Sequence, residues 1–298
     1  MQEIFNTIEK ASKTFMFGHV VLNKEKIQAF KIDDQKSIET FFAPPVYLSS
    51  LLKSLEKEEA YKIIHVYNAI NASLQYCFFI GNAQLRFDDI DSFWVMSMLD
   101  DVFKQYEVVS VEDIYKTKES IINMLMVSNI TLLRSRVQTV EEVFEKLDFD
   151  GYANAYADVN TSIEQLKKLV CFKQDIFFKK GLFAVMITAR MLPELKELHP
   201  VYKVALHQLP VPADYQIPKM LRHYGLIEFS DELASLVDNS VSLQENFEME
   251  LNIRAATVLA CEMLAQNNAC SVDDVDAYLF MKRKECDALH HLCVTRSY

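Results

Sequence analysis

Apolar residues recur at helical spacing along most of this chain. One stripe of this kind consists of Ile63, Val66, Tyr67 and Ile70. Residues three and four apart lie on one face of a helix, so such stripes predict amphipathic helices. Further segments with this pattern are residues 139–147, 159–169 and 182–192. We therefore expect several helices between residues 46 and 129, and a mostly α fold built as a single helical domain over residues 1–298.

The first 45 residues mix helical and extended patterns. Residues 4–13 have the spacing of an amphipathic helix, whereas residues 14–22 are β-prone and carry His19. Asn23 is a suitable first residue for a second helix. We expect segment 1–45 to pack on the helical domain and to supply a few short strands.

Two aromatic stretches allow more than one interpretation. Residues 74–81 are aromatic nearly throughout and fit either a buried strand or a core segment. Trp94, the single tryptophan, lies in an apolar stripe that is more typical of a core than of a ligand site.

Capping signals mark the helices near the C-terminus. Ser242 and Glu245 form a capping box, which predicts a long helix from there through Met263. Ser271 is placed to cap a further helix that carries Asp276.

Composition narrows the fold and the partners. With 298 residues and 50% hydrophobic content, the chain can bury a large core. Its 5 glycines argue against long all-β folds and phosphate-binding glycine loops. A net charge of −11 disfavours duplex nucleic acid as a partner, because phosphate binding depends on lysine and arginine. A small anionic ligand in a local basic pocket is compatible with this charge.

The N-terminus, the apolar runs and the cysteines bear on where the protein is located and whether it binds metal. The N-terminus is charged and lacks the apolar core of a signal peptide, and no apolar run reaches the roughly 18 residues of a membrane span. The six cysteines show no CxxC pair and are expected to be reduced thiols of a cytoplasmic protein. Cysteines and histidines in residues 286–293 match no common structural-zinc spacing, so we expect no metal and no other cofactor.

Asp214 lies in the segment with the clearest local constraints. Pro210 and Pro212 restrict the chain that leads to it, and Pro218 fits the first turn of the helix that follows. Gly225 is placed to end this helix in the left-handed conformation, and Ser230 is placed to cap the helix that follows. The pattern predicts a corner similar to a helix–hairpin–helix motif that holds one aspartate rigidly, either as a helix N-cap only or as a functional carboxylate.

Lys179 and Lys180 stand at the head of the apolar helix over residues 182–192. The ordinary interpretation is a pair of solvated lysines. However, the helix dipole disfavours lysine in a first turn, and a helix N-terminus with two lysines suits a phosphate group.

Several segments, in order, resemble the queuosine salvage proteins, which are queuosine 5′-phosphate N-glycosylases. Residues 212–219, PADYQIPK, are similar to the family's aspartate motif, and residues 229–233, FSDEL, follow at the family's spacing. Weaker similarities are found in residues 19–20, 74–79, 178–182, 250–255, 276–280 and 291–298.

The resemblance implies a fold similar to helix–hairpin–helix DNA glycosylases and a hydrolase that releases the base queuine for tRNA modification. It implies that Asp214 is the catalytic carboxylate and that His19 and Asp276 contact the base, with Tyr215 and Pro212 beside it. We infer that Lys179, with Lys180 next to it, contacts the 5′-phosphate. The expected partner is a small nucleotide or nucleoside, namely queuosine 5′-phosphate or queuosine, with queuine as the product.

The chain departs from the family pattern at several positions, which are Gln75, Phe79, Pro212, Gln216 and Ala277. Pro212 and Ala277 stand where the family pattern has aromatic residues, so we expect weaker stacking on the base. Two alternatives therefore stay open: a divergent glycosylase acting on another nucleoside or nucleic-acid base, and a non-catalytic helical protein that binds a ligand or acts as a scaffold.

Overall fold

A computed structural model describes residues 18–32, 42–79 and 90–298, together with Asn6, Ile8, Lys10 and Lys13. The fold is mostly helical, as the hydrophobic pattern predicts. Most of the predicted helix over residues 4–13 lies outside the described residues. In the described part of the chain, no helix has the length and apolar character that crossing a membrane requires.

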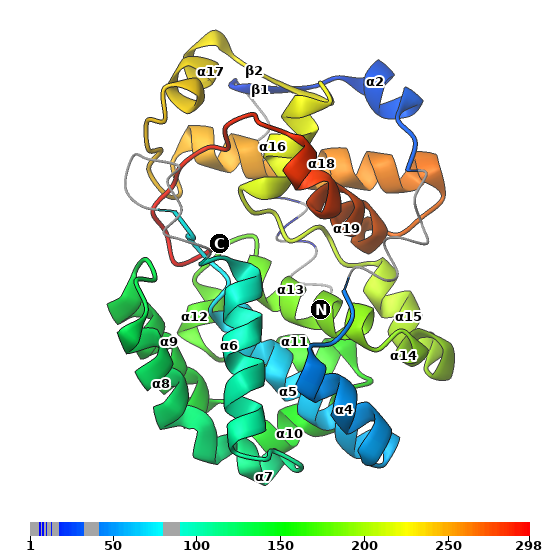
Figure 1. Cartoon of the computed structure of the whole chain (residues 1–298). Coiled ribbons are helices and arrows are strands. Elements are labelled where there is room, and N and C mark those ends of the chain that lie inside the picture. The colour runs from blue at the N-terminus through cyan, green and yellow to red at the C-terminus, as the bar shows by residue number, and fades with distance from the viewer. Residues whose placement is uncertain are drawn as a thin grey trace.

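The helices between residues 46 and 207 form the lower part of the molecule in Figure 1. They are α4 (Val46–Ser54), α5 (Lys57–Ser73), α6 (Ser92–Gln105), α7 (Val111–Ile114), the 3₁₀ turn η1 (Tyr115–Thr117), α8 (Lys118–Val127), α9 (Leu133–Lys146), α10 (Phe149–Asn154), α11 (Val159–Leu166), α12 (Val170–Lys173), α13 (Lys179–Met191), α14 (Glu194–Leu198) and α15 (Pro200–His207). The predicted helices over residues 139–147 and 159–169 are confirmed as α9 and α11, although α9 begins earlier.

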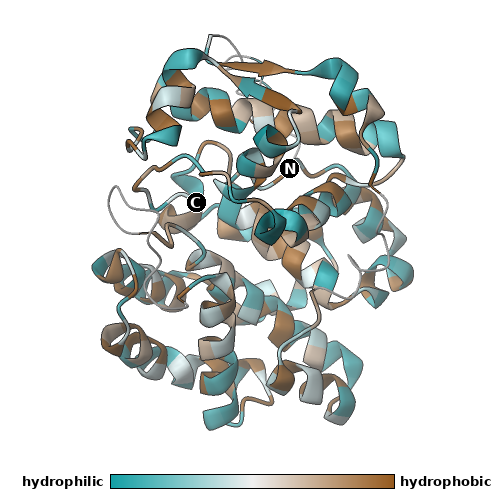
Figure 2. Ribbon diagram, turned by 45° about the horizontal axis from the view of Figure 1, so that its top comes forward, coloured by the Kyte–Doolittle hydropathy of each residue, from teal (hydrophilic) through white to brown (hydrophobic). Residues whose placement is uncertain are grey.

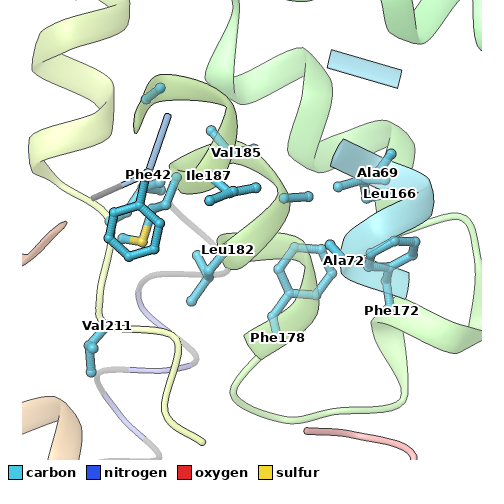
Figure 3. Packing of buried hydrophobic residues seen from close by; sticks show 14 of the residues in the cluster. Phe42, Ala69, Ala72, Leu166, Phe172, Phe178, Leu182, Val185, Ile187 and Val211 are labelled. Carbon is cyan, nitrogen blue, oxygen red and sulfur yellow. The ribbon is translucent and has the colours of Figure 1, made fainter. Parts of the chain in front are cut away.

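Helix α13 is central to this part because it is apolar on nearly every side. It packs on α5, which is buried from residue 63 to residue 73. Phe178 lies near Ala72 and Phe172 in Figure 3, and Leu182 is buried on another side of α13, so the start of this helix is embedded in the core. A helix that is apolar all round is stable only when other elements surround it. Most other helices carry hydrophilic and hydrophobic residues together (Figure 2).

The remaining elements form the upper part in Figure 1. They are β1 (Val20–Leu22), α2 (Lys24–Ala29), α16 (Gln216–His223), β2 (Ile227–Phe229), α17 (Asp231–Asp238), α18 (Glu248–Asn268), α19 (Val272–Lys282) and the 3₁₀ turn η2 (Arg283–Glu285). Strands β1 and β2 pair antiparallel, with Val20 opposite Phe229. The strand expected near His19 is therefore confirmed, and its partner comes from the distant corner after Asp214. Helices α2, α16 and α19 pack on α18.

Local signals placed several helix ends correctly. The side chains of Asn23, Ser230 and Ser271 cap α2, α17 and α19, and Ser271 forms a full capping box with Asp274. Gly225 follows α16 with a φ of +66°. The backbone N–H groups of residues 225 and 226 donate to the carbonyls of residues 222 and 221, which is the Schellman arrangement.

The structure corrects two other predictions. Helix α18 begins at Glu248, not at Ser242. Glu245 accepts hydrogen bonds from the hydroxyls of Thr295 and Ser297, so the expected capping carboxylate binds the C-terminal segment instead. Residues 74–79 form no strand and cross the core as irregular chain. The core interpretation of this aromatic stretch is therefore correct and the strand interpretation is wrong.

Candidate active site

A cleft lies where the two parts of the molecule meet. Its side chains come from residues 75–78, the start of α6, one face of α13, the segment leading into α16, and α19. Its empty volume is about 830 Å³, part of which is open to solvent. Concave sites where a few charged groups meet an apolar lining are where small molecules commonly bind. This cleft is therefore the candidate site.

Asp214 lines this cleft and also caps a helix. Its Oδ1 accepts hydrogen bonds from the backbone N–H groups of Gln216, at 2.7 Å, and Ile217, at 3.2 Å. Its Oδ2 makes no hydrogen bond with any residue that the structure describes. Pro210 and Pro212 are buried beside it, so the approach to the helix is fixed. One carboxylate oxygen thus holds the side chain in place while the other makes no bond to the described residues, so the capping and functional interpretations of Asp214 are compatible.

The two lysines at the head of α13 are buried, which contradicts their interpretation as a solvated pair. Lys179 lines the cleft, and its Nζ donates to the carbonyl oxygen of Gln75 at 3.0 Å. Burial lowers the pKa of Lys179, while the nearby carboxylates of Asp214 and Asp276 act in the opposite direction. Lys179 therefore places a cation beside the carboxylates of the cleft.

Lys180 points elsewhere. Its Nζ donates to the carbonyl oxygen of Arg296 at 2.7 Å, and it is not one of the residues that line the cleft. Burial lowers its pKa to about 8. The structure therefore separates the two lysines that sequence reasoning had grouped.

Asp276 enters the cleft from α19 as a second carboxylate. Its Oδ2 accepts a hydrogen bond from Nη2 of Arg190 at 2.7 Å, and Arg190 also binds Asp273 on the same helix. Burial raises the pKa of Asp276 to about 6, against the opposing effect of Arg190, and the charge of Asp214 raises it further. A carboxylate tuned to this range next to a second carboxylate and a lysine is typical of a functional site.

Aromatic side chains supply much of the remaining lining. Tyr215 contacts the rings of Phe79 and His290, at centroid distances of 5.4 and 4.5 Å. Pro212 also lines the cleft beside Asp214. Flat apolar walls near carboxylates suit a planar heterocycle, because ring faces favour stacking.

His19 does not line the cleft. Its Nδ1 is 3.2 Å from Oγ of Ser230, and its backbone N–H donates to Oδ1 of Asn252. The structure therefore gives the carboxylates, Lys179, Tyr215 and Pro212 a common cavity and leaves His19 beside the small sheet.

Sequence reasoning missed Phe183, Ile187 and Arg190, which line the cleft from α13. They follow Lys179 by four, eight and eleven residues, which is the spacing of one helix face. This periodicity would have found them once Lys179 was assigned to the site.

Comparison with known proteins supports the resemblance. The family model described as queuosine salvage protein matches residues 194–295, a range that includes Asp214, Tyr215 and Asp276. A stretch of 59 residues is 41% identical to the queuosine 5′-phosphate N-glycosylase/hydrolase of Dictyostelium discoideum. The aligned stretch covers 20% of this chain and 18% of that protein. The predicted similarity to queuosine salvage proteins is confirmed over this C-terminal third, whereas Lys179 lies before the matched range.

Proposed function

We propose that this protein hydrolyses the N-glycosidic bond of queuosine 5′-phosphate or queuosine and releases the base. One observation carries the proposal: Asp214 is fixed through one oxygen in a cleft that Asp276 and Lys179 also line. The match to the queuosine salvage family covers both aspartates and points to this substrate class.

Asp214 acts on the sugar. As the bond between the base and the anomeric carbon breaks, positive charge develops on that carbon and on the ring oxygen. A carboxylate held beside them stabilises this charge, as in glycosidases. Water then bonds to the anomeric carbon, and the base leaves with the electron pair of the broken bond. Asp214 takes the proton that water loses and then releases it to the solvent, while the departing base takes up one proton from the solvent, so that one water molecule is consumed.

The other residues bind the two ends of the substrate. The Asp276 carboxylate accepts hydrogen bonds from N–H groups on the edge of the base, which are strong because the acceptor is charged. Tyr215 packs against the base plane, with Pro212 next to it. Lys179 faces the 5′-phosphate. His19 has no part in this arrangement because it lies outside the cleft lining.

The test is chromatographic detection of base release from queuosine 5′-phosphate and from queuosine. Asp214→Asn keeps an oxygen for the helix cap but removes the negative charge. We expect it to lower kcat by about a hundredfold or more, which is the scale for loss of one electrostatic contact to a transition state.

A matched control is Asp158→Asn. Asp158 Oδ1 accepts from the backbone N–H groups two and three residues later, at 2.9 and 3.1 Å, as Asp214 does, but Asp158 caps α11 away from the cleft. This variant should release base at the wild-type rate. Full activity in Asp214→Asn would refute the role of Asp214. A folded wild-type protein that releases no base from either substrate would refute the proposed function.

A further inference from the structure

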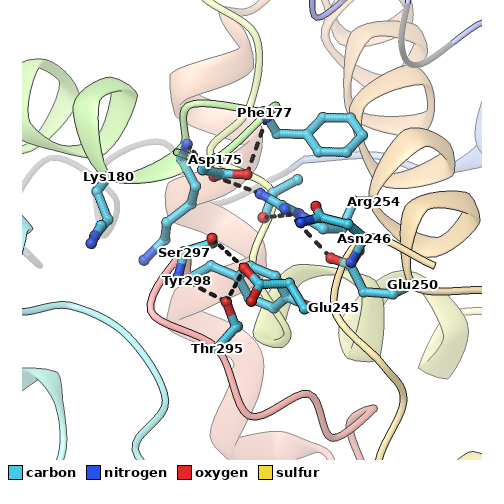
Figure 4. A network of polar contacts seen from close by, with 12 residues as sticks. Asp175, Phe177, Lys180, Glu245, Asn246, Glu250, Arg254, Thr295, Ser297 and Tyr298 are labelled. Atoms are coloured by element: carbon cyan, nitrogen blue, oxygen red, sulfur yellow. Dashed lines mark hydrogen bonds and ion pairs between the residues drawn. The ribbon is translucent and has the colours of Figure 1, made fainter. Parts of the chain in front are cut away.

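Arg254 of α18 lies fully buried between two parts of the candidate active site. Figure 4 shows its guanidinium at the centre of a polar network. Its Nε donates to the carbonyl oxygen of Ala213 at 3.1 Å, and its Nη2 donates to Oδ2 of Asp175 at 2.8 Å. Its Nη1 is 3.4 Å from Oε1 of Glu250.

The first contact reaches Asp214. Ala213 directly precedes Asp214, and its carbonyl belongs to the stretch that leads into α16. A hydrogen bond to this carbonyl fixes the backbone one residue before the carboxylate. The N–H groups that hold Asp214 Oδ1 lie just after it, so the aspartate is held from both sides.

The second contact reaches Lys179. Asp175 accepts from the backbone N–H groups of Phe177, at 3.1 Å, and of Lys179, at 2.8 Å, and so holds the backbone of the first residue of α13. Arg254 therefore connects the backbone beside Asp214 with the residue that orients Lys179. A guanidinium suits this task because its donors form a rigid planar fork, whereas the single ammonium of lysine does not reach two acceptors in the same way.

Aromatic and C-terminal groups close the network. The guanidinium carbon lies 4.5 Å from the centroid of the Phe177 ring and 4.3 Å from that of Tyr298. Thr295 and Ser297, next to Tyr298, bind the carboxylate of Glu245. In these surroundings Arg254 has little freedom to move, so its hydrogen bonds fix the positions of the Ala213 carbonyl and the Asp175 carboxylate relative to each other.

We infer that Arg254 is a positioning residue that sets the Asp214 carboxylate relative to Lys179, acting through Ala213 and Asp175. The inference rests on the proposed function, because positioning has kinetic meaning only if Asp214 acts on substrate. A shift of 1 Å in a catalytic group can lower a rate about a hundredfold. The link through Asp175 should therefore affect kcat. Glu250 also binds the guanidinium, but its other oxygen accepts from the backbone N–H of Asn246 at 3.0 Å, and it makes no bond to Ala213 or to the start of α13.

Two isosteric variants separate these roles. Asp175→Asn and Glu250→Gln each remove one buried carboxylate charge from the same guanidinium, but only Asp175 also holds the start of α13. With queuosine, which has no phosphate, Asp175→Asn should lower kcat by about 10- to 100-fold with KM changed less than about threefold. Glu250→Gln should keep kcat within about threefold of wild type. Arg254→Lys, which retains the charge, should behave like Asp175→Asn.

A second measurement does not depend on turnover. Amide hydrogen exchange at Gln216 and Ile217 reports the bonds that hold Asp214 Oδ1. We expect protection at these amides to fall about tenfold in Asp175→Asn and Arg254→Lys, and to stay at the wild-type level in Glu250→Gln.

The outcomes are distinguishable. Equal losses of kcat and protection in Asp175→Asn and Glu250→Gln would overturn the inference, since they would indicate a general response to lost charge. Unchanged kcat and protection in Arg254→Lys would also overturn it. If wild-type protein releases no base, the proposed function fails, and the exchange pattern still decides whether Arg254 fixes the Asp214 turn.

Discussion

The ionisation of Asp276 should control activity near pH 6. The carboxylate form is the one that accepts hydrogen bonds from a base, and burial places its pKa at about 6. For a group with this pKa, about nine tenths of the molecules carry the charge at pH 7 and only about one tenth at pH 5. We therefore expect kcat/KM to fall about tenfold between these values. Queuosine is the substrate for this assay, because a phosphate ester itself titrates near pH 6.

Asp276→Asn should remove this pH dependence. It should also lower kcat/KM at pH 7 by about 10- to 100-fold, because hydrogen bonds to a charged group contribute roughly 1.5–3 kcal/mol. Asp273→Asn is the matched control, since Asp273 binds the same Arg190 from the same helix but does not line the cleft. The charge of Asp273 contributes to the raised pKa of Asp276. This control should therefore keep the acid limb of the pH profile and move it to lower pH.

The assay is initial-rate base release between pH 5 and pH 7.5, with circular dichroism at each pH to confirm that the protein is folded. A constant kcat/KM across this range would refute the reasoning. Persistence of the same acid limb in Asp276→Asn would assign the titration to another group and refute it equally.

Three further predictions concern other buried groups. In steady-state assays, Lys179→Met should raise KM for queuosine 5′-phosphate about tenfold or more and leave KM for queuosine nearly unchanged. Lys180 lies outside the cleft, so Lys180→Met should affect the two substrates equally. Burial lowers the pKa of His65 to about 3, so between pH 6.5 and pH 3 the unfolded chain binds more protons than the folded chain and the free energy of unfolding falls as the pH falls. Urea titrations should show a shallower fall for His65→Phe. Gly181→Ala would place a Cβ 2.1 Å from Cε1 of Phe178, and urea unfolding should show a loss of about 1–3 kcal/mol, whereas an unchanged midpoint would contradict this packing.

Local sequence signals predicted much of the fold. Asn23, Ser230 and Ser271 cap helices as expected, because an N-cap is decided by a side chain and the backbone two or three residues away. The helix start predicted at Ser242 is wrong because a residue far along the chain decides the contact. Its partner residue Glu245 is taken by the hydroxyls of Thr295 and Ser297, some fifty residues further along the chain. A competing tertiary contact cannot be read from local spacing.

The site was predictable in part. Asp214 was identified as a candidate because prolines and a glycine mark its corner, Lys179 because it stands at the start of an apolar helix, and Asp276 through the resemblance. Burial of the two lysines was not predictable, since it depends on how the core surrounds the start of α13. The role of Arg190 also depends on tertiary structure, because its partners Asp273 and Asp276 are more than eighty residues away.

The small sheet has a consequence for the order of folding. Strand β1 pairs with β2, and α2 packs on α18, more than 200 residues later in the sequence. Ribosomes add roughly 5–20 residues per second, so β1 and α2 emerge ten seconds or longer before their partners. Closing such long loops is slow, and an unpaired strand edge invites aggregation in the meantime. We therefore expect residues 18–32 to be a chaperone-dependent part of the nascent chain and to dock last, after α16 and α18 have formed.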